Sequence, residues 1–216
     1  MLQQEKLLEE KPMETKTNLK SILPRAIQPG DTIGVASPSN SILEKDEDCI
    51  KKSKELWEHL GYRVKFSSHA CTNSLGYSET AKNKADDLNA MFADPEVKVI
   101  ICSKGGYNSN SVLDYLDYET IQKNPKILCG FSDITTLTNA IYAKTGLVTF
   151  NGACFKALTS WETDYGFQEM VKRFQMKSLA IGTQEDGYET IHPGKAMGKL
   201  VGGNLCLTTW LASRKI

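Results

Sequence analysis

The sequence predicts an α/β fold: a doubly wound, mostly parallel sheet covered by helices on both faces, followed by the start of a second domain. Short apolar runs typical of strands alternate with segments of helical periodicity along the first two thirds of the chain. One run, residues 97–103, is apolar almost throughout, as expected of a strand covered on both faces. Such alternation is typical of βαβ units. The pattern weakens after about residue 158, where we expect the first domain to end.

The first expected unit is a strand, a helix and a second strand. The strand covers residues 32–37, and in the helix at 41–60 apolar side chains such as Trp57 recur at helical spacing. Gly61 provides a stop at the C-terminus of this helix. Residues 62–67 then alternate between polar and apolar side chains, which predicts a strand with one buried face.

The second expected helix covers residues 78–93 and precedes the apolar strand 97–103. Ser78 can cap its N-terminus, and an apolar face follows at helical spacing. Pro95 disfavours helical geometry at the residue before it, so the helix is expected to end there.

The last part of the alternating pattern holds two short helical segments, a strand, a longer helix and another strand. In chain order these segments are 109–116, 118–123, 127–131, 133–145 and 147–150. Pro125 separates the second helical segment from the strand, and Gly146 ends the longer helix.

We expect four parts along the chain. They are a disordered leader at 1–22, the α/β domain at 23–158, a linker or crossing at 159–195, and the truncated start of a C-terminal domain at 196–216. The leader is charged and lacks the apolar stretch of a secretory signal. The final residues still have a helical pattern, which is why we expect the second domain to be incomplete.

Composition excludes several classes of function. The 26 basic and 26 acidic residues give a formal net charge of zero, so no field of one sign attracts nucleic acid or an anionic membrane. No apolar run is long enough to span a bilayer. The six cysteines form no C-x-x-C pair, and the three histidines lack metal-ligand spacing. We therefore expect a cytoplasmic protein with no nucleic-acid partner, no membrane span, no metal and no cofactor.

Ser132 is the candidate nucleophile, because it follows a buried strand directly and opens a helix. This arrangement resembles a nucleophile elbow, in which a sharp turn exposes the hydroxyl group above the sheet. The match to G-x-S-x-G is partial, since Ile134 stands where the second glycine would be. An alternative interpretation is that Ser132 or Asp133 simply caps the helix.

Gly105 and Gly106 follow the strand 97–103 and lie at the expected ligand-binding edge of the sheet. Without a side chain, a glycine lets its backbone N–H approach a ligand closely. These residues are therefore candidates for half of an oxyanion hole, with the N–H of Asp133 as the other half. The alternative is a turn that needs glycine only for its positive φ.

Eight short segments, taken together, resemble the LD-carboxypeptidases and the related microcin C immunity peptidases of serine peptidase family S66. They are QPGDTIG at 28–34, SPS at 37–39, GGYNSN at 105–110, LDY at 116–118, NPK at 124–126, GFSDIT at 130–135, YAKTG at 142–146 and GGNL at 202–205. Their order and spacing extend over most of the chain, and the Asn-Ser-Asn at 108–110 looks more like the immunity branch.

The resemblance implies that residues 23–158 are the nucleophile domain of a serine hydrolase that needs no metal. Ser132 matches the family's nucleophile, and the backbone N–H groups of Gly106 and Asp133 match its oxyanion hole. The residues expected to contact the substrate lie in the loop that contains Gly106. They are Gly105, Tyr107 and Asn108.

The family's chemistry implies hydrolysis of the amide bond before a C-terminal residue. The substrate would be a murein peptide or a microcin-C-like peptide nucleotide, and the assembly a homodimer. A histidine would take the proton from the serine and return it to the leaving amine, while a glutamate orients the imidazole.

The chain departs from the family in the two other members of the triad. The family's glutamate and histidine lie downstream of the GGNL segment, and this chain ends a few residues past it. Glu189 and His192 precede that segment, at positions the family does not use. We therefore expect weak or no catalysis from this chain, and an exposed apolar face. The alternative function is a truncated, non-catalytic binding domain of the same family.

Overall fold

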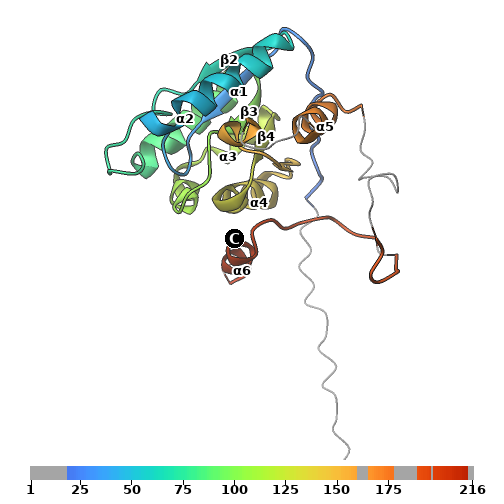
Figure 1. Cartoon of the computed structure of the whole chain (residues 1–216). Coiled ribbons are helices and arrows are strands. Elements are labelled where there is room, and N and C mark those ends of the chain that lie inside the picture. The colour runs from blue at the N-terminus through green and yellow to red at the C-terminus, as the bar shows by residue number, and fades with distance from the viewer. Residues whose placement is uncertain (1–18, 160–164, 178–188, 196, 214–216) are drawn as a thin grey trace, which may run out of the picture.

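The computed structural model of the protein (Figure 1) describes residues 19–159, 165–177, 189–195 and 197–213. Five parallel strands form one sheet in the order β2-β1-β3-β4-β5. The strands are β1 (Thr32–Ala36), β2 (Arg63–Phe66), β3 (Val97–Cys102), β4 (Ile127–Gly130) and β5 (Phe150–Asn151). The predicted α/β fold with a parallel, doubly wound sheet is confirmed.

Six α-helices and four short 3₁₀ helices lie in the described ranges. The α-helices are α1 (Glu47–His59), α2 (Ala81–Ala93), α3 (Tyr118–Lys123), α4 (Thr135–Thr145), α5 (Tyr165–Phe174) and α6 (Leu205–Ala212). The 3₁₀ helices are η1 (Glu44–Asp46), η2 (Ser109–Tyr115), η3 (Ser132–Ile134) and η4 (Phe155–Thr159). None of the described helices is long and apolar enough to pass through a membrane.

Helices cover both faces of the sheet, and each face has its own apolar core. On one face α1, α5 and η4 pack against the strands around the fully buried Trp57, whose ring contacts Tyr62, Phe167 and Phe174. On the other face α2, α3 and α4 pack around Phe92, which is also fully buried. This two-sided cover explains why β3, apart from Lys98, and β4 are apolar.

The start of α2 differs from the prediction. The helix begins at Ala81, and Thr80 caps it by accepting a hydrogen bond from the N–H of Asn83. Ser78, predicted as the cap, is buried and donates its hydroxyl group to the backbone oxygen of Ser39 instead, 2.7 Å away. Ser78 is thus committed to a residue distant in sequence, and the next hydroxyl residue takes the cap.

The edge next to β5 also differs from the expected strand 147–150. Leu147 makes only an isolated bridge with Ile22, and the regular pairing with β4 begins at Phe150. Residues 19–22 therefore lie against this edge. Several parts of the expected division lie outside the described residues: 1–18 of the leader, 160–164 and 178–188 of the linker, and 196 and 214–216 of the C-terminal part.

Candidate functional site

The candidate site lies at the carboxyl ends of β1, β3 and β4. In this strand order the winding reverses between β1 and β3, and ligands bind beyond the carboxyl ends at such a point. The segments after these two strands are joined there by the hydroxyl groups of Ser37 and Ser103, whose oxygens are 2.7 Å apart. The segment after β4 begins with Phe131 and Ser132.

Ser132 lies at a sharp turn between β4 and α4. Its φ angle is 61°, in the left-handed region that residues other than glycine rarely adopt, whereas Phe131 before it is extended. The side chain is half-buried, and its hydroxyl group makes no hydrogen bond within the part of the chain that the structure describes. A strained backbone beneath an unengaged hydroxyl group is the geometry of a nucleophile elbow.

The interpretation of Ser132 or Asp133 as a helix cap is wrong. The 3₁₀ turn η3 starts after Phe131 and α4 starts after Ile134, and neither N-terminus has a side-chain cap. Ser132 therefore has a strained conformation that capping does not explain.

The two glycines after β3 are required by close packing and not by a turn. Neither Gly105 nor Gly106 is among the glycines with positive φ, so the turn interpretation is wrong. A Cβ atom at Gly105 would lie 3.1 Å from the Cβ of Ser132. One at Gly106 would lie 2.2 Å from Asn40 Oδ1 and 2.5 Å from Ser39 Oγ. The loop after β3 thus packs directly between Ser132 and the loop after β1.

The side chain of Asp133 ties these loops together. Its carboxylate accepts hydrogen bonds from the hydroxyl group of Ser39 (2.5 Å) and the N–H of Ser109 (2.8 Å). The hydroxyl group of Ser109 in turn donates to the backbone oxygen of Asp133 at 2.5 Å. All three residues are buried, so the hydrogen bonds fix the start of α4 against the neighbouring loops.

Two backbone N–H groups remain unused beside Ser132. Those of Gly106 and Asp133 donate no hydrogen bond to any described residue. The N–H of Asp133 belongs to the first turn of a helix, where such donors lack intrahelical partners. Both N–H groups are therefore able to donate a hydrogen bond to an oxygen atom of a ligand.

The residues predicted to bind substrate differ in their exposure. The Tyr107 side chain is 88% exposed. Asn108 is half-buried, and both its backbone oxygen and its Oδ1 accept hydrogen bonds from the Lys84 ammonium group, at 3.3 and 3.0 Å. Burial lowers the pKa of Lys84 to about 8, against the charges of Asp133 and Glu79, which raise it.

No histidine of the described residues is hydrogen-bonded to Ser132. His69 contacts Asp87, with His69 Nδ1 and Asp87 Oδ1 2.9 Å apart. His59 and His192 are exposed, as is Glu189. The described residues therefore bring the loop of Gly105 against the expected nucleophile, but none of their histidines is bonded to Ser132 as a base would be.

Two buried titratable side chains lie near the site. Asp46 ends the 3₁₀ turn η1, and its carboxylate is fully buried between Lys104 and Lys156. Burial alone would raise the pKa of Asp46, but these two lysines outweigh it and hold that pKa at about 2. Cys129 is in the core as predicted, and burial raises the pKa of its thiol, so it is no nucleophile.

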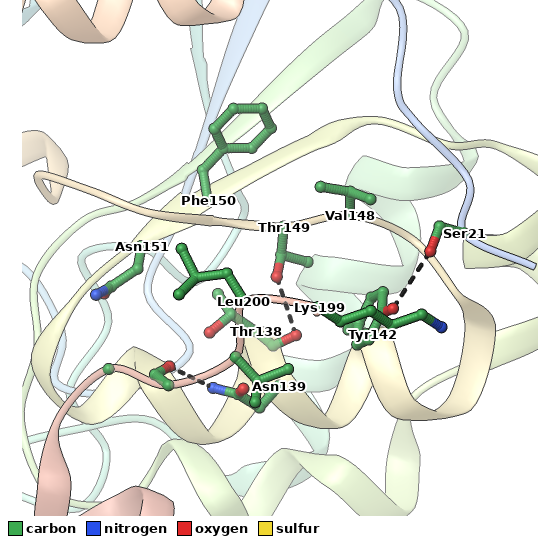
Figure 2. Close-up of a pocket in the computed structure, with 13 residues that line it drawn as sticks. Ser21, Thr138, Asn139, Tyr142, Val148, Thr149, Phe150, Asn151, Lys199 and Leu200 are labelled. Carbon is green, nitrogen blue, oxygen red and sulfur yellow. Dashed lines mark hydrogen bonds between the residues drawn. The ribbon is translucent and has the colours of Figure 1, made fainter. Parts of the chain in front are cut away.

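A cavity of about 650 Å³ lies next to the candidate site, between α4, β5 and the segment 199–203 (Figure 2). Thr149 donates to the backbone of Thr138, and Asn139 donates to the backbone oxygen of Gly202, so most polar groups on its walls are already bonded. Ser132 is not among the residues that line it. The cavity follows the outer edge of β5, and the elbow lies outside it.

Several site residues carried no readable signal in the sequence. Ser39, Asn40, Ser109 and Lys84 contact the expected nucleophile's loops from segments 23 or more positions away from Ser132. Their roles depend on strand order, which residue patterns do not specify. Two of them, Ser39 in SPS at 37–39 and Ser109 in GGYNSN at 105–110, lay in segments that the family resemblance had marked.

Comparison with known families places the described site within a recognised domain. Residues 33–152 match the family Peptidase S66, described as the LD-carboxypeptidase N-terminal domain. YocD of Bacillus subtilis is 36% identical over 209 residues, which is 83% of this chain and 62% of that protein. The probable murein peptide carboxypeptidase of Bacillus subtilis is 35% identical over 195 residues, 86% of this chain and 58% of that protein. This chain thus spans about three fifths of the length of these relatives.

Solved structures show the same fold. An MccF-like protein from Bacillus anthracis is 40% identical, with a TM-score of 0.66 over 70% of this chain and 46% of that chain. The microcin C7 self-immunity protein MccF, a protein known from Escherichia coli, has been solved in complex with aspartyl sulfamoyl adenosine. That structure is 26% identical, with a TM-score of 0.76 over 89% of this chain and 66% of that chain.

Proposed function

Because the chain belongs to the LD-carboxypeptidase family, we propose that it is the nucleophile-bearing part of a serine-type carboxypeptidase. The reaction is hydrolysis of the amide bond before a C-terminal residue. Ser132 attacks the carbonyl carbon, and the N–H groups of Gly106 and Asp133 stabilise the oxyanion that forms.

The observation that carries this proposal is the left-handed backbone of Ser132. A strained, uncapped serine with a free hydroxyl group is costly to keep, by about 1–3 kcal/mol, unless it serves the site. The loop of Gly105 packs directly against it, and the N–H groups of the next residues, Gly106 and Asp133, donate no hydrogen bond to any described residue.

The base is proposed to be a histidine oriented by a glutamate, as in the family pattern. Without such a base the serine hydroxyl group is a weak nucleophile, and loss of triad members costs several orders of magnitude in rate. Since no described histidine bonds to Ser132, we expect turnover by this chain alone to be weak or absent.

The proposed substrates are a murein peptide and a microcin-C-like peptide nucleotide. Relatives support both, one by its name as a murein peptide carboxypeptidase and one by its complex with aspartyl sulfamoyl adenosine. Gly105, Tyr107 and Asn108 are proposed to contact the bound chain, the exposed Tyr107 ring by packing on it. A homodimer is also expected from the family pattern, and sedimentation velocity tests it.

A non-catalytic binding domain is the second candidate function. It is favoured by the same observation that weakens the first, the lack of a described histidine bonded to Ser132. In this case the N–H donors would hold a carbonyl or carboxylate oxygen of a ligand without turnover.

The test compares the 216-residue chain with its Ser132→Ala and Gly106→Ala variants. Release of D-Ala from a murein tetrapeptide, cleavage of a microcin-C-like conjugate, and binding of each by calorimetry are measured. Turnover abolished by Ser132→Ala supports the carboxypeptidase and means that Ser132 has another base. Binding without turnover, lost in Gly106→Ala, supports the binding domain. Absence of both turnover and binding overturns the proposed function.

A further inference from the structure

Lys84 is a buried cation whose position needs an explanation. Its side chain is on the first turn of α2, and the residue is 2% exposed. Burying a charge costs free energy unless it is paired, and the positive end of the helix dipole disfavours a cation there. The contacts of Lys84 must therefore offset two unfavourable terms.

These contacts lead directly to the loop after β3. The ammonium group donates to the backbone oxygen and to Oδ1 of Asn108, and the Asn108 amide group lies 3.4 Å from the hydroxyl group of Tyr77. The next residue, Ser109, is bonded twice to Asp133. Lys84 thus holds one end of the loop whose other end, Gly105, contacts Ser132.

We propose that Lys84 is a positioning residue of the site, which fixes Asn108 and thereby the direction of the Gly106 N–H relative to that of Asp133. The proposal rests on the proposed function of these two donors. Lys84 does not act as the base, because no hydrogen bond joins it to Ser132 within the described residues. Its effect passes through the backbone between Gly106 and Ser109.

The ionisation of Lys84 gives the proposal a specific signature. The charged groups that face the ammonium group are the carboxylates of Asp133 and Glu79, and the Tyr77 hydroxyl group is the titratable group next to Asn108. Because the pKa of Lys84 is lowered to about 8, its charge and its pull on Asn108 decline as pH rises through that value. The loop should loosen over the same range.

Lys126 provides a matched control at the other end of the strands, where β4 begins. It is 7% exposed, burial lowers its pKa to about 8, and its ammonium group also donates to backbone oxygens, those of Met91 and Asp94. It precedes β4, whereas the candidate site follows β4. Replacing it removes the same kind of interaction without touching the loop.

The experiment measures backbone ¹⁵N order parameters and amide shifts in wild type, Lys84→Met and Lys126→Met between pH 7 and 9.5. At pH 7 we expect order parameters of about 0.85 at Gly106 and Asn108 in wild type and Lys126→Met, and below about 0.6 in Lys84→Met. In wild type the Gly106 and Asn108 shifts should titrate with a midpoint near 8, and Lys84→Met should lack this transition. Tyr77→Phe should retain it.

Equal order parameters at Gly106 in the two methionine variants would overturn the proposal. If Lys84→Met does not fold, Asn108→Ala, which removes the Oδ1 acceptor of the Lys84 ammonium group, takes its place, and a Gly106 order parameter equal to that in Lys126→Met overturns the proposal. The substrate-binding assay is run on the same samples. Absence of binding with the expected order parameters counts against the proposed function only. If wild type binds the substrate but Lys84→Met keeps the order parameters of wild type, the result counts against the role of Lys84 only.

Discussion

At the scale of single residues, the candidate site depends on two positions whose residue types are unusual for opposite reasons. Ser132 keeps a side chain where the backbone favours glycine, and Gly106 lacks one where the neighbours leave no room. The first stores strain and the second permits close packing. Each reason predicts a different response to mutation.

Ser132→Gly is expected to stabilise the protein. Glycine adopts a φ of 61° without the steric cost that other residues pay, so the free energy of unfolding should rise by about 1 kcal/mol relative to Ser132→Ala. Urea unfolding of both variants measures the difference. Equal midpoints would mean that the turn is not strained. Met176→Gly, at the other described non-glycine residue with positive φ, is the positive control.

Gly106→Ala is expected to damage the site more than the fold. Its Cβ would overlap the side chains of Asn40 and Ser39, so these side chains or the loop after β3 must shift, at a cost of about 1–3 kcal/mol. Ligand affinity should fall at least about tenfold, as measured by calorimetry. Gly194→Ala is the control, since nothing lies within 4 Å of the added carbon atom. Unchanged affinity in Gly106→Ala would contradict the assignment of its N–H to the site.

At the scale of elements, the strands and helices could be predicted because their signals are local. Apolar periodicity and Gly or Pro at the ends identify the strands and helices from β1 to α4, but the first helix, expected from residue 41, begins as an α-helix only at Glu47, after the 3₁₀ turn Glu44–Asp46. Ser132 could be found for the same reason, since a buried strand and a helix meet there. The cap of α2 could not, because Ser78 bonds to Ser39, 39 positions away. The burial of Lys84 could not be predicted either, because its partner Asn108 is 24 positions away.

Trp57 is expected to control how α1 and α5 pack together. Its ring is fully buried and contacts Tyr62, Phe167 and Phe174, so Trp57→Ala leaves a cavity in this face and should cost about 3–5 kcal/mol. Urea unfolding measures the loss. The substitution should also accelerate amide hydrogen exchange more in α5 than in α2, because α2 lies on the other face of the sheet. Uniform acceleration in both helices would contradict this local effect.

At the scale of the whole molecule, the apolar surface near the C-terminal segment remains exposed. Leu200, Val201 and Leu205 are all more than half exposed, while Asn204 donates its backbone N–H to Thr135 and so holds this segment against α4. The core of the α/β domain is complete without them, because both of its faces are covered by helices that precede residue 175.

Buried titratable groups of opposite effect should shape the pH dependence of global stability. Lys126 binds its proton more weakly when folded, so the unfolded chain carries more protons above about pH 8 and stability rises with pH there. The buried thiols of Cys102, Cys129 and Cys154 have raised pKa values, so they oppose this rise at higher pH. The thiols are common to wild type and Lys126→Met, and their contribution cancels when the two are compared.

The free energy of unfolding of wild type minus that of Lys126→Met should therefore rise by about 1 kcal/mol between pH 8 and 9. Below pH 7 the difference should be constant, because both the folded and the unfolded chain then hold the proton. Urea titrations at half-unit steps measure it. A difference that stays flat to pH 9 would show that the folded protein keeps Lys126 charged, with the backbone oxygens of Met91 and Asp94 fully offsetting its burial.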